Sequence, residues 1–318
     1  MIKPQNIIAQ ISKNLKTKKW TCLAPECNEV AINSHLIQQN GLLSNITEKG
    51  HLVELRMRDA YKWNEKEPPI IFERVGISNA LSHPVFCKKH DTEIFKSIEQ
   101  SNMEFDTYES FLLFSYRAVC AEIRKKQINI EQYTRIINAK TLDGILNKEN
   151  LHLMVRGSEL GIKDLEILKK ELEDEIEAHS DKYNFFAFTY PKFDLYASAA
   201  FSATDVHPNR KEEEFDLENI YIHILPLQNE SLILVGYHEQ YKSPNTEKYC
   251  RAWEGLSQQD LEIKLTNLFA TNIENWGLSP MKFGNLKEGN KRKYIQILTE
   301  NTNYFGVDKN YNFNLFKQ

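Results

Sequence analysis

The residues best suited to chemistry in this sequence are two close pairs of metal-binding side chains in its first hundred residues. Cys22 and Cys27 are separated by four residues, and Cys87 and His90 by two. Structural zinc sites take four Cys or His ligands, usually as two such pairs, each on its own tight turn. The spacing of four is at the edge of the usual range, and Pro25 can tighten that turn. The sequence therefore predicts a structural zinc ion bound by these four side chains.

Other residues leave alternatives open at this site. His51 and His83 are further candidate zinc ligands if one of the first two cysteines does not bind. The four residues could instead be unrelated side chains of a core, where free cysteines are often found. Cys120 and Cys250 are expected to be small buried side chains. Five cysteines in 318 residues are too few and too unevenly spaced to indicate a disulfide framework.

The segments between the two pairs have the patterns of short strands and turns. Residues 29–33 (EVAIN) are strand-like, and two further strands are predicted at 51–58 and 70–75. Residues 34–47 (SHLIQQNGLLSNIT) predict a helix broken near Gly41.

The second pair runs directly into a helical pattern that Asp91 or Thr92 could cap. It would therefore lie on a turn at the N-terminus of a helix. A zinc turn, a hairpin and a second zinc turn that opens a helix form a treble clef. About residues 20–100 are predicted to be such a module.

These residues resemble the HNH endonuclease group of treble-clef folds. EVAINSHLIQ is similar to the first HNH strand, which ends in a general-base histidine, and FCKKHDTEIF is similar to the second zinc turn with the helix behind it. The resemblance implies a divalent-metal phosphodiesterase acting on nucleic acid. It implies that His35 deprotonates the attacking water, while a Mg or Mn ion bound partly by Asp91 stabilises charge on the phosphate.

The sequence also departs from the HNH pattern. SHLIQ lacks the proline that usually follows the base, Asp91 stands where a histidine or asparagine is usual, and the middle asparagine has only Asn45 and Asn79 as candidates. Ser34 and His35 could equally begin a helix, and an acid at 91 could be an ordinary cap. These features fit a treble clef that has kept its zinc site and lost its catalytic activity. The wider N-terminal pattern also resembles a group of bacterial proteins that supplies no activity to transfer.

The charge of the chain is unevenly distributed. Residues 1–100 carry 14 Lys and Arg against 11 Asp and Glu, a net charge of +3, whereas the rest of the chain carries −7. Lys16, Lys18 and Lys19 end an amphipathic helix predicted at 4–17. These lysines could contact phosphate or form a solvated helix end. The charge permits a nucleic-acid partner without requiring one.

Composition and length indicate a compact chain of two or three packed units. Apolar residues make up 41% and charged residues 26%, the usual balance for a globular protein. The first residues lack the apolar region of a signal peptide, and no stretch reaches the roughly 18 apolar residues of a membrane span. We expect a cytoplasmic protein with no membrane partner. Only 12 glycines and no Gly-rich phosphate loop disfavour nucleotide-cradling folds.

The predicted fold class is α+β. Helices are predicted near 104–126, 163–179 and 261–273, the first of them apolar on almost every side and therefore interior. Alternating residues predict half-buried antiparallel strands near 193–203, 220–224 and 231–237. His223 and His238 fall on these strands and are expected to be surface or packing residues. The last thirty residues are poorly patterned.

These features divide the chain into three predicted segments, namely a treble-clef zinc module at 1–100, a helical region at 101–185, and an antiparallel sheet with helices at 186–318. Two functions are open. One is a metal-dependent HNH-like nuclease or nucleic-acid-binding protein, which the resemblance associates with bacterial defence against mobile DNA. The alternative is a non-catalytic, zinc-stabilised scaffold that binds a protein partner, because zinc alone can supply on the order of 10 kcal/mol to a small fold.

Overall fold

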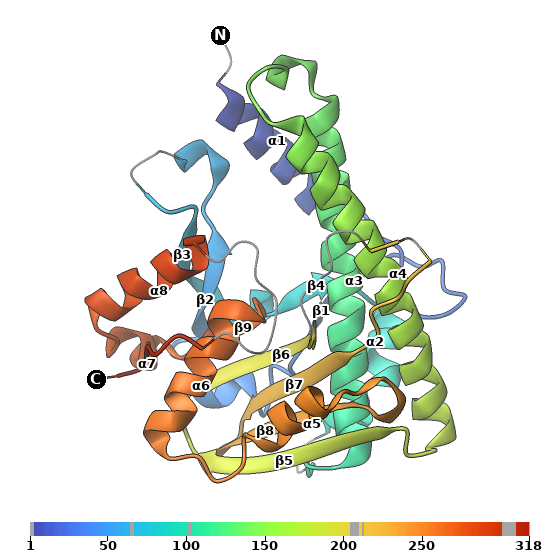
Figure 1. The fold of residues 1–318 in the computed structure, drawn as a ribbon, viewed down its shortest axis with the longest axis vertical. Helices are drawn as coiled ribbons and strands as arrows, with labels where there is room; N and C mark the ends of the chain where they lie inside the picture. Colours follow the sequence, from blue (N-terminus) through green and yellow to red (C-terminus); the bar gives the residue numbers. More distant parts are fainter. Residues whose placement is uncertain are drawn as a thin grey trace.

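An antiparallel sheet forms the centre of the structure (Figure 1). The structure is a computed structural model, which describes residues 3–63, 67–100, 103–203, 210–211, 213–300 and 310–317. The sheet has seven strands in the order β3-β2-β9-β6-β7-β8-β5. Their bounds are β2 His51–Met57, β3 Ile70–Gly76, β5 Tyr183–Pro191, β6 Leu195–Ser202, β7 Asn219–Pro226, β8 Glu230–His238 and β9 Trp276–Leu278.

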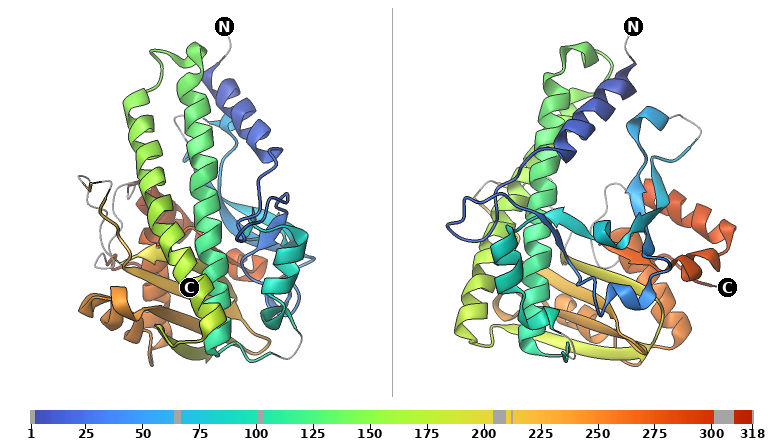
Figure 2. Two further views of the ribbon diagram at one scale, coloured as in Figure 1. Left: turned by 90° about the vertical axis from the view of Figure 1, so that its right-hand side faces the viewer. Right: turned by 180° about the vertical axis from the view of Figure 1, so that it is seen from behind.

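Helices cover both faces of this sheet, so the architecture has three layers (Figure 2). Helices α3 (Tyr108–Asn138) and α4 (Lys148–Ala178) pack together on one face. The other face is covered by α6 (Gln258–Thr271) and its neighbours. The fold class is therefore α+β, as predicted. The prediction of half-buried strands is wrong for β6 and β7, because their alternating residues enter two different cores.

The remaining helices are short. Their bounds are α1 Pro4–Lys16, α2 Lys88–Ile94, α5 Pro244–Arg251, α7 Pro280–Gly284 and α8 Glu288–Glu300. The prediction of a helix at 4–17 is confirmed, and α1 packs beside the far end of α3 (Figure 1). Residues 34–47 are not the predicted helix. The chain there leaves strand β1 (Asn33–His35) and turns through Gly41, whose positive φ of 92° suits glycine.

Helices α3 and α4 form a long antiparallel pair, visible in both views of Figure 2. The side chain of Thr107 caps α3 and that of Asn147 caps α4. Each helix has 31 residues, more than predicted. The first half of α4 is largely exposed and contains two glycines, so it lacks the apolar stripe that marks a helix in a sequence.

Strand β9 joins the first part of the chain to the last. It pairs with β2 through Val53 and Leu278 and with β6 through Ala197 and Trp276. The strands of one sheet thus come from both sides of residue 100, where a segment boundary is predicted. That three-part division stays a prediction, and the sheet runs across it.

A buried carboxylate reinforces this junction. Glu54 of β2 accepts hydrogen bonds from the Tyr196 hydroxyl at 2.8 Å and from the Leu81 backbone N–H at 2.9 Å. Its other oxygen accepts from Arg56 at 2.5 Å. Burial raises the pKa of Glu54, and these donors oppose that shift. The Tyr196 ring reaches Glu54 only because it lies directly against Gly277, whose missing side chain leaves room for it.

Gly277→Ala should therefore destabilise the fold. An added Cβ would overlap the ring and hydroxyl of Tyr196, and such overpacking costs about 1–3 kcal/mol. The control is Gly157→Ala, because an added Cβ at this exposed position of α4 meets nothing within 4 Å. Alanine there should raise stability by up to about 1 kcal/mol. Urea unfolding of both variants measures the two effects, and a Gly277→Ala protein as stable as wild type would contradict the packing described.

His223 lies fully buried between α3 and the sheet, as a packing residue. Its Nδ1 is 3.0 Å from the Ser198 hydroxyl and its Nε2 is 3.1 Å from the Ser115 hydroxyl. Burial lowers the pKa of this imidazole to about 3, so the ring is neutral in the folded protein at neutral pH.

Stability should consequently fall as the pH drops below about 6.5, where the unfolded chain binds a proton at His223 and the folded chain does not. Between pH 7 and 5.5 this residue should account for about 1 kcal/mol of lost stability. In His223→Gln that part of the loss should disappear. Urea unfolding at the two pH values tests this, and an equal loss in both proteins would show that His223 does not carry it.

Candidate metal centre

Four metal-binding side chains converge at one point of the fold. The ligand atoms of Cys22, Cys27, Cys87 and His90 all lie within 4.8 Å of one another. His90 Nδ1 is 3.5 Å from Cys22 Sγ and 3.3 Å from Cys87 Sγ, and the sulfurs of Cys27 and Cys87 are 3.9 Å apart. A tetrahedral zinc ion with ordinary bond lengths requires about 3.6 Å between S and N and about 3.8 Å between two sulfurs. The cluster can therefore hold a metal ion such as zinc.

The first pair lies on a hairpin near the start of the chain. The N–H of Cys22 donates to the carbonyl of Glu29 at 2.8 Å, which closes the hairpin. The N–H of Cys27 donates to the carbonyl of Ala24 at 3.3 Å and closes a tight turn that contains Pro25. This turn brings the two cysteines together despite the four residues between them.

The second pair lies where α2 begins. Cys87 occupies the N-cap position, so the prediction that Asp91 or Thr92 caps this helix is wrong. The backbone N–H of His90 points at the sulfur of Cys87, and this hydrogen bond lowers the pKa of the Cys87 thiol. A donor aimed at the sulfur favours the thiolate, which is the form that binds a metal.

Backbone hydrogen bonds hold the two turns together. Leu23 N–H donates to Val85 C=O at 3.0 Å, and Ile32 N–H donates to Phe86 C=O at 2.7 Å. Strand β1 also pairs with β4 (Ser82–Pro84). Residues far apart in the sequence thus lie side by side through contacts that do not involve the cluster itself.

His35 ends strand β1 and is half-buried. Its Nε2 lies 3.1 Å from the carbonyl oxygen of Ser78 and 2.7 Å from the side-chain nitrogen of Gln39. Burial lowers the pKa of His35, and the nearby Arg117 guanidinium lowers it further. The imidazole is therefore neutral at pH 7.

Asp91 lies on α2, one residue after His90, and its charge acts on His35. Its carboxylate is 3.7 Å from the guanidinium of Arg117, which also pairs with Glu99 at 2.6 Å. Burial raises the pKa of Asp91, while Arg117 opposes this shift. The two predicted catalytic residues are thus near each other, but Asp91 already has a cation beside it.

A second metal site at His35 and Asp91 would have no third protein ligand. Within the ranges that the structure describes, the Cys22, Cys27, Cys87 and His90 group is the only one with three or more Cys, His, Asp or Glu donors close enough to share an ion. An ion at His35 and Asp91 would need water or phosphate oxygens to complete its coordination.

The other candidate ligands lie outside the cluster. The imidazole of His51 is 2.8 Å from the carbonyl oxygen of Lys49, and neither His51 nor His83 belongs to the group of converging donors. Cys120 and Cys250 are fully buried, as expected.

Two buried arginines on α3 were not among the predicted functional residues. Arg117 is 1% exposed and Arg124 is 2% exposed, although arginine is rarely buried. A signal was present, because both residues lie in or next to the most apolar stretch of the chain. Arg117 contacts the candidate catalytic residue Asp91, and Arg124 contacts the hairpin that carries Cys22.

Comparison of the chain with known protein families, with curated proteins and with solved structures finds no match. The resemblance to HNH endonucleases therefore depends on the two short sequence motifs alone and stays a prediction. Among the described residues, no helix is both long enough and apolar enough to cross a bilayer.

The purified protein should contain one tightly bound zinc ion per chain, and Cys87→Ser should remove it. The variant should also unfold at a markedly lower temperature, because structural zinc contributes on the order of 10 kcal/mol. The control is Cys250→Ala, which changes a buried thiol in a different core and should keep its zinc. Elemental analysis and thermal unfolding measure both effects. A zinc-free wild-type protein that unfolds no earlier than a zinc-loaded one would contradict the assignment.

Proposed function

We propose that this chain is a zinc-stabilised, HNH-like protein that binds nucleic acid, with His35 and Asp91 as its candidate catalytic residues. The observation that carries the proposal is the convergence of four donors from two separate turns. Their set, three sulfurs and one imidazole, is typical of structural zinc sites. Such a site fills its coordination with protein ligands, so the zinc would support the fold and would not act on a substrate.

Two features support nucleic acid as the partner. The resemblance to HNH endonucleases places His35 at the position of the general base. The positive charge of the first hundred residues, with lysines at the end of α1, favours contact with phosphate. A role in bacterial defence against mobile DNA depends on the resemblance alone and remains a prediction.

The state of His35 is compatible with a base. A neutral imidazole can accept a proton from water, and the lowered pKa keeps it neutral at pH 7. If Nε2 donates its proton to the carbonyl of Ser78, Nδ1 is the nitrogen left to act as the base; in the other tautomer Nε2 accepts from the amide of Gln39 and Nδ1 carries the proton. A Mg or Mn ion at Asp91 would supply Lewis-acid stabilisation of the phosphate, and it would have to compete with Arg117 for that carboxylate.

One observation favours the non-catalytic alternative. Arg117 is buried, pairs with both Asp91 and Glu99, and stacks on the ring of Phe95 at 3.8 Å. A carboxylate used in this way stabilises the packing of α2 on α3 and needs no metal. Under this alternative the zinc module is a scaffold, and the partner is a protein.

His35→Ala separates these possibilities. If the chain is a nuclease, wild-type protein with Mg or Mn should cleave plasmid DNA or RNA. The variant should lose at least about a hundredfold in rate, the usual contribution of a general base. Zinc content and thermal unfolding should stay unchanged. His51→Ala is the matched control, because His51 lies outside both the cluster and the candidate site.

The negative outcomes are equally informative. Wild-type protein that binds an oligonucleotide but cleaves neither DNA nor RNA with either metal would leave nucleic-acid binding standing and remove catalysis. Protein that neither binds nor cleaves nucleic acid would overturn the proposal in favour of the scaffold.

A further inference from the structure

A buried arginine lies beside the zinc-binding hairpin without a carboxylate partner. Arg124 projects from α3, and its guanidinium donates to the backbone carbonyl of Thr21 and, at 2.7 Å, to the side-chain oxygen of Gln127. Its Nε has no hydrogen-bond partner, and no Asp or Glu of the described chain forms an ion pair with it. Arg117, seven residues earlier on the same helix, is equally buried but pairs with two carboxylates.

Burying Arg124 without a carboxylate partner costs free energy. A buried cation is expensive unless an opposite charge or a full set of hydrogen bonds accompanies it. Loss of solvation lowers the pKa of Arg124 to about 10, which still leaves the side chain charged at neutral pH. The site thus holds a positive charge at neutral pH that no described Asp or Glu side chain pairs with.

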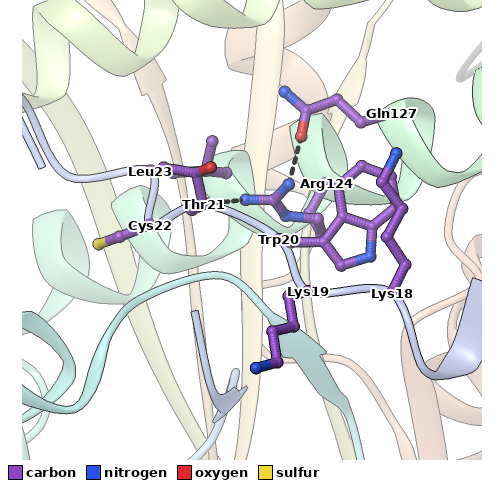
Figure 3. A pocket seen from close by; sticks show the side chains of 8 residues that line it. All are labelled: Lys18, Lys19, Trp20, Thr21, Cys22, Leu23, Arg124 and Gln127. Carbon is purple, nitrogen blue, oxygen red and sulfur yellow. Dashed lines mark hydrogen bonds between the residues drawn. The ribbon is translucent and has the colours of Figure 1, made fainter. Parts of the chain in front are cut away.

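Arg124 lines a pocket of about 330 Å³ that opens between α3 and the hairpin (Figure 3). Lys18, Lys19 and Trp20 line the same pocket, as does the candidate metal ligand Cys22, and no Asp or Glu does. Lys18 lies over the Trp20 ring at 4.3 Å, and the Arg124 guanidinium lies 4.9 Å from that ring. Figure 3 shows the indole between these two cations, with Lys19 on the other side of the hairpin strand.

Only one of the three cations that line this pocket forms an ion pair with a described residue. Lys18 pairs with Glu131, a residue outside the pocket lining, at 2.9 Å. Lys19 is exposed and forms no ion pair with any described residue. Arg124, which two hydrogen bonds hold in place, and Lys18 lie on one side of the strand, and Lys19 lines the pocket from the other side. These cations give the pocket a positive charge that is complementary to an anion. The volume is at the lower end of the range for small-molecule sites.

We propose that this pocket binds a phosphate group, with Arg124 as the fixed donor and Lys18 and Lys19 as mobile ones. Guanidinium groups suit phosphate because their N–H groups match its oxygens in pairs. Trp20 supplies an apolar wall for whatever carries the phosphate. The inference deepens the proposed function if the phosphate belongs to nucleic acid, yet it depends only on the geometry of the pocket.

A rival account gives Arg124 a structural role. Three thiolates, one imidazole and one Zn²⁺ would leave a net charge of −1, and Arg124 is close enough to Cys22 to interact with it electrostatically. In that account the arginine stabilises the zinc cluster and the pocket binds nothing. The two accounts predict different consequences of the same substitution.

Calorimetric titration of the zinc-loaded full chain with inorganic phosphate tests the proposal. One phosphate should bind per chain, and Arg124→Gln should weaken binding at least tenfold while the zinc content stays at one. Lys19→Gln should weaken it several-fold, and because this side chain is exposed the variant should fold normally. Lys13→Gln is the matched control, since it removes an exposed lysine of α1 outside the pocket.

The outcomes distinguish a failure of the phosphate-pocket proposal from a failure of the proposed nucleic-acid function. Three results would overturn the proposal. The first is a wild type that does not bind phosphate, and the second is unchanged binding in both pocket variants. The third is loss of zinc in Arg124→Gln while Lys19→Gln binds phosphate as tightly as the wild type. A single-stranded oligonucleotide that competes with phosphate would support it with nucleic acid as the ligand. Phosphate binding without any oligonucleotide binding would support it with a small phosphorylated ligand, and would count against nucleic acid as the partner.

Discussion

The structure depends on one constraint, which is that the first half of α3 must be covered on every side. From Ser110 to Ala121 every residue of this helix is buried. A helix that is apolar all round has no face for water, so three other parts of the protein surround it. On one side Phe111 stacks on Phe185 of the sheet, on another Tyr116 packs on Phe86 next to the candidate metal ligand Cys87, and α4 covers the rest. The arrangement of these parts follows from their common use of α3.

Polar groups make this packing specific. Apolar contacts around a helix can slide, whereas a buried charge needs its partners in fixed places. Arg117 contacts α2 through Asp91 and the turn after α2 through Glu99, and Arg124 contacts the hairpin of Cys22 and Cys27 through Thr21. Both turns of the candidate metal centre are therefore positioned from α3 by an arginine. The four donors meet because backbone hydrogen bonds join their two turns, and both turns also contact the same helix.

The local features of the sequence predicted much of this structure. The paired metal ligands, the hairpin strands β2 and β3 and the buried start of α3 all have patterns that depend on near neighbours in the chain. The helix predicted at 34–47 failed because its apolar residues enter the core that also contains α3 from irregular chain on both sides of Gly41, and do not lie along one helical stripe. The burial of both sheet faces could not be predicted, because polar residues such as Ser198 and His223 satisfy each other across strands. The apolar surroundings of Arg117 and Arg124 in the sequence indicated burial, but Asp91, Glu99 and Thr21 are distant in the sequence, so these contacts could not be predicted.

The position of β9 has a consequence for synthesis on the ribosome. This strand of three residues inserts between β2 and β6, so the seven-stranded sheet cannot close until residues 276–278 have left the exit tunnel. Until then the hairpin of β2 and β3 has an unpaired edge, a form prone to wrong pairings. The metal donors, in contrast, are complete once His90 has emerged. Early capture of an ion would give the nascent N-terminal segment a folded form long before its place in the sheet exists.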